Sequence, residues 1–204
     1  MAFVLKGWSE SSLLKTYDME RQPAAEFYMQ QAFTRLVKRV YHGKGFDFQE
    51  EVPDLKCELG YRYTRGALYD SLDDAASAQN LEDPTNPLAL PGSRLPHFIL
   101  QDTRRGADVS SLDLIQQRLV LLVGDDNSPW LQAAKAQHVL IDTYILHATS
   151  FPYADTTDSA RAILKLSQAE AVLVRPDCHI AWRSGTSTAP QKEQLETALL
   201  RIFG

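Results

Sequence analysis

The chain has 204 residues, of which 44% are hydrophobic and 23% charged, with 21 Lys plus Arg against 26 Asp plus Glu. A globular chain of this size buries a sufficient core without a structural metal or a disulfide framework. The net charge of -5 would repel nucleic acid and acidic membrane surfaces, so neither is an expected partner. The two cysteines, Cys57 and Cys178, form no CxxC pair, which argues against a zinc cluster and a thioredoxin-type redox site.

No segment has the pattern of an export signal or a membrane span. The apolar run at residues 3–5 is interrupted by Lys6 and Gly7 and is too short for the core of a signal peptide. The longest apolar stretch, residues 119–123, is far shorter than the roughly 20 residues that a transmembrane helix needs. The sequence therefore predicts a cytoplasmic protein.

Residues 1–70 predict a helical segment. Residues 9–12 supply N-cap candidates for a short helix, and Pro23 is expected to begin a second, longer one. Across residues 24–42 apolar side chains recur at helical spacing, and Gly43 is expected to end that helix. Its apolar face requires a partner, and the periodicity does not distinguish the protein's own core, a second subunit and a ligand.

The next stretch is rich in proline and glycine, and we assign residues 71–95 to a loop or linker at a domain boundary. Just before it, residues 60–66 alternate in polarity and predict a short strand.

Residues 96–204 predict an α/β domain. Strands are expected at residues 97–101, 119–123, 138–146, 171–175 and 179–183, and helices at residues 129–135, 158–168 and 191–203. The first strand–helix–strand alternation implies a parallel βαβ unit. The order β-α-β-α-β-β-α predicts a thioredoxin-like domain without CxxC, preceded by the helical segment.

Two runs of residues are specific enough to indicate a family. Residues 4–8 and 12–23 (VLKGW and SLLKTYDMERQP) are similar to the segment just downstream of the flavin site in phenol-hydroxylase-type, FAD-dependent aromatic monooxygenases. Residues 171–183 (AVLVRPDCHIAWR) resemble the signature near the end of that family's carboxy-terminal, thioredoxin-like domain, with Cys178 where the signature usually has glycine. The resemblance covers nearly the whole chain and implies the carboxy-terminal portion of such an enzyme.

The resemblance does not extend to a flavin site. Members of this family are expected to open with a Gly-x-Gly-x-x-Gly turn that places a helix amino terminus against the FAD pyrophosphate. No such spacing occurs among the ten glycines, so we expect this chain to bind no FAD by itself and to use no other cofactor. Redox chemistry therefore cannot be transferred from the resemblance, because side chains alone do not activate dioxygen.

Three residues are the candidates for catalysis. His147 follows the predicted strand 138–146, at the end of a parallel strand where open α/β sheets place ligands, and is the first choice for an acid or base. A merely solvated loop histidine is the alternative. Tyr144 and Tyr63 are candidate hydrogen-bond donors to a developing charge. None of the five histidines has metal-ligand spacing, so no metal site is expected.

Aromatic residues gather in the first third of the chain. We predict that Trp8, Phe33, Tyr41 and Tyr61 bind a hydrophobic small molecule, since aromatic rings with hydroxyl tips suit a mostly apolar ligand. The alternative is that these rings form an interface, either in a homodimer or with a flavin-bearing partner.

Two functions fit these observations. The first is a cofactor-free enzyme, derived from a flavin monooxygenase, that promotes isomerisation, cyclisation or a pericyclic step in natural-product biosynthesis by orienting a hydrophobic substrate. The alternative is a non-catalytic partner, or the carboxy-terminal half of a split FAD-dependent monooxygenase.

Overall fold

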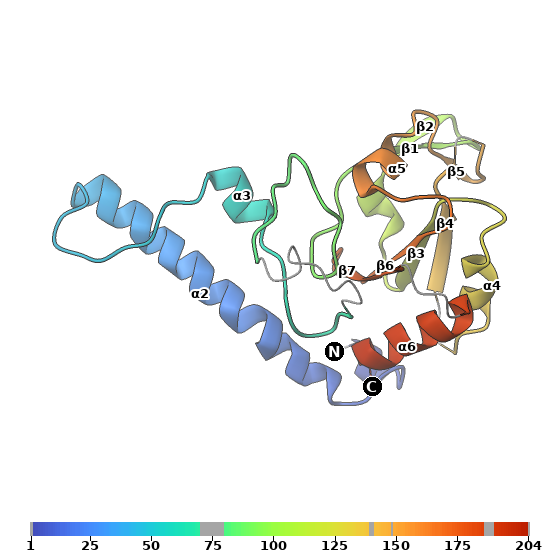
Figure 1. The fold of residues 1–204 in the computed structure, drawn as a ribbon, viewed down its shortest axis with the longest axis horizontal. Helices are drawn as coiled ribbons and strands as arrows, with labels where there is room; N and C mark the ends of the chain where they lie inside the picture. The colour runs from blue at the N-terminus through green and yellow to red at the C-terminus, as the bar shows by residue number, and fades with distance from the viewer. Residues whose placement is uncertain (1, 70–79, 139–140, 148, 186–189, 204) are drawn as a thin grey trace.

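A computed structural model describes residues 2–69, 80–138, 141–147, 149–185 and 190–203. A long helix, α2, leads into an α/β body built on a four-stranded sheet, and α2 extends away from this body along part of its length (Figure 1). Among the described residues, no helix combines the length and the apolar character that crossing a membrane requires.

The amino-terminal segment is helical, as predicted, with α1 at Ala2–Leu5, α2 at Leu13–Val40 and α3 at Asp54–Leu59. The prediction that Pro23 separates two helices is wrong, because α2 continues through it. The φ angle of proline fits a helix, and what is lost is the one hydrogen bond that its missing N–H cannot donate. Contacts of the buried neighbours Glu20 and Ala24 hold the helix on both sides of that position.

The helix ends close to the predicted stop. The last helical residue is Val40, and the N–H of Gly43 donates to the carbonyl of Val37 at 3.1 Å. Gly43 has φ +73°, in the left-handed region that glycine adopts without strain, which explains the stop.

The central sheet has the strand order β4-β3-β6-β7. Its strands are β3 at Leu119–Val123, β4 at Ile141–Ile145, β6 at Ala171–Val174 and β7 at Ile180–Arg183. β3 and β4 are parallel and joined through α4 (Trp130–Lys135), whereas β6 pairs antiparallel with both β3 and β7. The predicted α/β class and its βαβ unit are confirmed.

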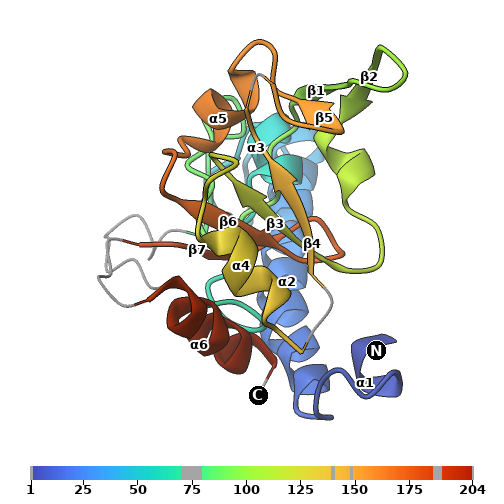
Figure 2. The ribbon, with the colours of Figure 1, turned by 90° about the vertical axis from the view of Figure 1, so that its right-hand side faces the viewer.

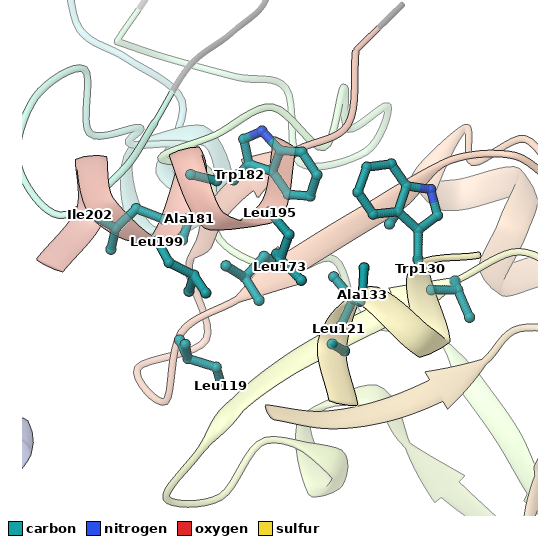
Figure 3. Packing of buried hydrophobic residues seen from close by; sticks show 14 of the residues in the cluster. Leu119, Leu121, Trp130, Ala133, Leu173, Ala181, Trp182, Leu195, Leu199 and Ile202 are labelled. Carbon is teal, nitrogen blue, oxygen red and sulfur yellow. The ribbon is translucent and has the colours of Figure 1, made fainter. Parts of the chain in front are cut away.

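Apolar side chains cover both faces of this sheet. On one face α4 and α6 (Gln191–Phe203) lie side by side, and Leu195 packs with Leu121 and Leu173 (Figures 2 and 3). The rings of Trp130 and Trp182 meet edge to face there, 5.3 Å apart. On the other face the core includes residues from β1 (Ile99–Asp102) and from α5 (Ser159–Leu164).

A second, three-stranded sheet was not predicted. It has the order β2-β1-β5, with β1 at Ile99–Asp102, β2 at Ala107–Ser110 and β5 at Tyr153–Ala154, and the 3-10 helix η2 at Ser111–Leu114 follows β2. The predicted helix 158–168 is shorter than expected, because Lys165 takes φ +49° and ends α5. These short elements lack the periodicity that sequence patterns detect.

Residues 60–66 do not form the predicted strand. The structure shows an isolated bridge between Tyr61 and Leu81 and a hydrogen bond from the Tyr63 N–H to the carbonyl of Gly92. The alternation in this segment instead reflects aromatic rings that pack on α2 and on the β6–β7 turn.

The described part of the predicted linker 71–95 lacks regular structure but packs closely. Ala89 and Leu95 are buried, and the backbone of residues 92–95 runs antiparallel to the segment 178–180, exchanging hydrogen bonds with it. Residues 70–79 lie outside the described structure, and the division into segments 1–70, 71–95 and 96–204 stays a prediction.

Candidate functional site

The amino-terminal half of α2 and the turn between β6 and β7 enclose a pocket of about 910 Å³. We call it the Tyr63 pocket. Its apolar lining is Phe3, Leu13, Leu14, Tyr17 and Phe203, and its polar lining includes Lys6, Glu20, Arg21, Tyr63, Gln116, Gln117, Arg175, Asp177 and His179. An apolar wall opposite convergent polar groups is the usual composition of a small-molecule site.

Arg175 ties the sheet to α2 at the base of this pocket. Its Nη1 and Nη2 donate to the two carboxylate oxygens of Glu20 at 2.7 and 2.8 Å, and its Nε donates to Asp177 at 3.0 Å. Nη2 also donates to Asp177, and Nη1 to the carbonyl of Ala67. Every N–H of the guanidinium thus has an acceptor, so Arg175 is a structural clamp with no donor left for a ligand.

Burial alone would lower the pKa of Arg175, but the hydrogen bonds and charges of Glu20 and Asp177 raise it above its ordinary value. In the same way burial would raise the pKa of Asp177, and the hydrogen bonds from His179 and Arg175 lower it well below its usual range. Arg175 and Asp177 therefore stay ionised at neutral pH.

A second set of polar groups lies next to the clamp. Arg21 Nη1 donates to the Tyr63 hydroxyl at 2.9 Å, which raises the pKa of Arg21. The Tyr63 ring packs on the His179 imidazole with ring centroids 4.7 Å apart. His179 Nδ1 lies 3.1 Å from the Asp177 carbonyl oxygen, so a proton on Nδ1 makes this hydrogen bond.

Tyr63 is the one predicted site residue that lines this pocket. The rings of Tyr61 and Tyr63 lie side by side with their centroids 6.0 Å apart, but Tyr61 lines a separate pocket of about 470 Å³. Trp8 does not line the pocket, and its ring packs on the lining residue Phe3 with ring centroids 5.3 Å apart.

The other two aromatic candidates lie near the carboxyl-terminal end of α2. Both Phe33 and Tyr41 pack on the ring of Phe46 there, with ring centroids 5.8 and 4.9 Å apart. The four residues predicted to bind substrate are thus spread along α2 and its flanking segments, and the structure does not bring them into one cavity.

His147 and Tyr144 do not line the Tyr63 pocket either. His147 follows β4 at its carboxyl end, as predicted, and its Nδ1 lies 3.1 Å from Thr149 Oγ1. Tyr144 packs on Tyr153 at 5.6 Å, and burial raises the pKa of its hydroxyl. The three candidate catalytic residues are not brought together, and their roles stay predictions.

Sequence reasoning assigned no function to Glu20 and Arg21, although both lie in the run that resembles the hydroxylase family. Glu20 and Arg175 are 155 residues apart, so no local pattern connects them. A carboxylate on the buried side of a helix was the available signal, because such a group requires a cationic partner.

Within the described ranges no group of His, Cys, Asp and Glu side chains could hold a metal ion. The described residues also do not fit the FAD pyrophosphate. A dinucleotide site needs a helix that follows a strand through a glycine-rich turn. The helix α2 follows α1, and the turn of residues 124–129 that joins β3 to α4 contains a single glycine, Gly124.

Residues 88–204 match the family model described as aromatic-ring hydroxylase, C-terminal, so the chain belongs to this family. The resemblance to the carboxy-terminal portion of flavin-dependent aromatic monooxygenases is thereby confirmed.

Curated relatives match along the whole chain. It is 35% identical to 4-methyl-5-nitrocatechol 5-monooxygenase from Burkholderia sp. and 30% identical to aklavinone 12-hydroxylase RdmE from Streptomyces purpurascens. Both comparisons cover 100% of this chain, which spans 38% and 37% of the length of these relatives.

Solved structures give the same result. The chain is similar to aklavinone-11 hydroxylase, solved with FAD and aklavinone, with a TM-score of 0.86 and 29% identity over 99% of this chain and 37% of that one. It is also similar to the flavin-dependent monooxygenase PieE, solved with FAD and substrate, with a TM-score of 0.76, 25% identity and coverage of 98% and 41%.

Proposed function

We propose that this chain serves as the carboxy-terminal portion of a flavin-dependent aromatic hydroxylase, and that an apolar face of α2 packs against the flavin-bearing portion. That portion belongs either to the same polypeptide or to a separate one. The observation that carries the proposal is that the carboxyl-terminal half of α2 exposes four large apolar side chains while two polar ones, Gln31 and Thr34, are buried.

The exposed face is a stripe of large apolar side chains. Met29, Phe33, Leu36 and Val40 are 67%, 41%, 48% and 58% exposed. Their spacing of four, three and four residues places them along one side of a helix. We call this set the α2 stripe.

The buried face of the same half of α2 consists of Val37 and two polar residues, Gln31 and Thr34. Gln31 donates to the Glu50 carbonyl at 3.1 Å and accepts from the Val52 N–H at 2.8 Å, while Thr34 is fully buried. Each residue turns the helix by about 100°, so Gln31 and Thr34 lie on the side opposite Met29. This half of α2 buries one large apolar side chain, Val37, and leaves the four of the stripe exposed, so most of its apolar side has no covering surface among the described residues.

The relatives indicate what covers the stripe. They extend well beyond the portion to which this chain is similar, and the aklavinone-11 hydroxylase structure contains FAD. A flavin-bearing portion is therefore the occupant for which these observations argue, ahead of a second copy of this chain.

The test is a chimera in which this chain replaces the aligned part of the Burkholderia relative. Leu36→Ser should destabilise the flavin-loaded chimera by about 2 kcal/mol, because a contact that is buried in the assembly is lost. In the isolated chain the same change should cost less than about 0.5 kcal/mol, since Leu36 is largely exposed there. Thermal unfolding, followed by flavin fluorescence in the chimera and by circular dichroism in the chain, measures both effects.

Arg39→Ser is the matched control, because Arg39 is also exposed on α2 but lies outside the stripe. It should change the free energy of unfolding of the chimera and of the isolated chain by no more than about 0.5 kcal/mol. Equal effects of Leu36→Ser in the chimera and in the isolated chain would contradict the proposal.

The Tyr63 pocket favours a second candidate function. Its apolar wall and the Tyr63 hydroxyl suit a cofactor-free enzyme that orients a hydrophobic substrate for isomerisation, cyclisation or a pericyclic step. Turnover of such a substrate by the colourless isolated chain, lost in Tyr63→Phe, would support this function over the first.

A further inference from the structure

The Tyr63 pocket contains cations that no carboxylate neutralises. Arg21 lines it and, among the described residues, makes its one hydrogen bond to the Tyr63 hydroxyl. Lys6 also lines it, and its Nζ lies over the Trp8 ring, 4.6 Å from the centroid. Neither side chain forms an ion pair within the described part of the chain.

The other charges of the pocket belong to the clamp. Glu20 and Asp177 are bound to Arg175, so the lining as a whole carries three cationic side chains against two carboxylates when His179 is neutral. The pocket is therefore locally positive on a chain whose net charge is -5. Such a local field selects an anionic ligand.

The hydrogen-bond donors that Arg21 and Tyr63 present to the pocket suit a carboxylate. The Tyr63 hydroxyl accepts from Arg21 and retains its own proton to donate, and Arg21 has further N–H groups. A guanidinium and a phenol hydroxyl side by side offer donors to both oxygens of a carboxylate. The remaining wall, which includes Phe3, Leu13 and Leu14, offers apolar surface for a ring system.

We propose that the Tyr63 pocket binds a planar aromatic carboxylate, with the carboxylate on Arg21 and Tyr63 and the ring system on the apolar wall. Lys6 contributes to the attraction as a second positive charge at the pocket. This site lies at the amino-terminal half of α2, away from the α2 stripe, so variants of the two sites test the two proposals separately.

Isothermal titration calorimetry of the 204-residue chain tests the proposal with 2-naphthoate and its neutral analogue 2-naphthamide. The naphthoate should bind saturably, about tenfold more tightly than the amide, and its affinity should fall as salt is added. Arg21→Gln should weaken naphthoate about tenfold while leaving the amide nearly unchanged. Tyr63→Phe should weaken naphthoate by a smaller factor, because one neutral donor is lost.

Arg104→Gln is the matched control, since Arg104 is an exposed arginine beyond β1 that lies over the Phe151 ring. It should leave both affinities unchanged. Leu36→Ser should also leave naphthoate binding unchanged, which separates this proposal from the one about the α2 stripe.

Three results would each overturn the proposal: no saturable binding of naphthoate, equal affinity for naphthoate and naphthamide, or undiminished naphthoate binding by Arg21→Gln. Circular dichroism verifies that the variants are folded. If Arg21→Gln is not folded, Lys6→Gln replaces it, with a loss of naphthoate affinity but not of amide affinity as the expected result.

Discussion

Glu20 shows how one residue can join distant parts of this chain. It is 6% exposed, yet its carboxylate accepts from Arg175 and from the Ala67 N–H at 2.7 Å. A buried carboxylate is costly unless its oxygens are bound in this way. Gly66 makes the arrangement sterically feasible, because a Cβ at this position would lie 2.4 Å from the Glu20 side chain.

Glu20→Gln should lower the free energy of unfolding by about 3 kcal/mol. Removing one partner of a buried pair leaves the other charge uncompensated, and here Asp177 compensates Arg175 in part. Urea denaturation measures the change. Glu26→Gln on the exposed side of the same helix is the control and should stay within about 0.5 kcal/mol. Equal losses in the two variants would show that the clamp contributes little.

Cys178 illustrates a second consequence at the scale of one residue. It takes φ +64°, in the left-handed region, at the turn between β6 and β7. Glycine adopts this conformation without steric cost, which explains why the family signature usually has glycine here. Burial raises the pKa of the Cys178 thiol, so the thiolate is disfavoured and the residue is poorly suited to act as a nucleophile.

At the scale of elements, α2 is the helix whose stability depends on its tertiary contacts. It continues through Pro23 although that residue cannot donate to the carbonyl four residues earlier. The helix is therefore weakened at one position and held there by tertiary contacts, of which the Glu20 clamp is the strongest.

Pro23→Ala should raise the free energy of unfolding by about 1 to 2 kcal/mol. The gain of a helical hydrogen bond and of helix propensity, up to about 3 kcal/mol, exceeds the 0.4–1 kcal/mol that proline provides by restricting the unfolded chain. Urea denaturation measures it. The control Pro84→Ala lies outside helices and strands and should show a small loss instead. If Pro23→Ala has the same or a lower free energy of unfolding, the packing of the proline ring stabilises the helix by at least as much as the missing hydrogen bond would.

For the molecule as a whole, carboxyl groups with a lowered pKa make the free energy of unfolding decrease as the pH falls into the acid range. Among the described residues, the pKa is lowered for the carboxyl groups of Asp83, Asp125, Glu170 and Asp177. A carboxyl group with a lowered pKa in the folded state binds fewer protons there than in the unfolded chain. Its contribution is complete above the unfolded pKa of about 4 and is lost as the pH falls toward the folded pKa.

We therefore expect the free energy of unfolding to fall steadily from about pH 5 to pH 2. Asp177→Asn should be less stable than the unmodified chain at pH 7 and should lose less on acidification, because one of the groups that titrates has been removed. Urea denaturation at pH 7, 5, 4 and 3 tests this. Asp108→Asn, which removes an exposed carboxylate on β2, is the matched control for the loss of one negative charge. An Asp177→Asn curve parallel to that of the unmodified chain would contradict the expectation.

The sequence by itself determined the class of the protein and most of its regular elements. Residues 119–123 are uniformly apolar, which fits a central strand buried on both faces, and the helix 191–203 was predicted with its observed bounds. Such elements are encoded locally, because hydrophobic periodicity and length reflect which faces are buried. The two runs that resemble the hydroxylase family identified it without reference to the structure.

Only the tertiary structure decided which residues meet. Periodicity identified the apolar residues of α2, but not that the α2 stripe is exposed while Val37 is buried together with Gln31 and Thr34. Likewise the Glu20–Arg175 clamp and the Arg21–Tyr63 pair join segments 155 and 42 residues apart. Local patterns specify what each segment becomes, whereas contacts between distant segments depend on how all of the elements pack, and this is why the candidate site residues were predicted as separate positions.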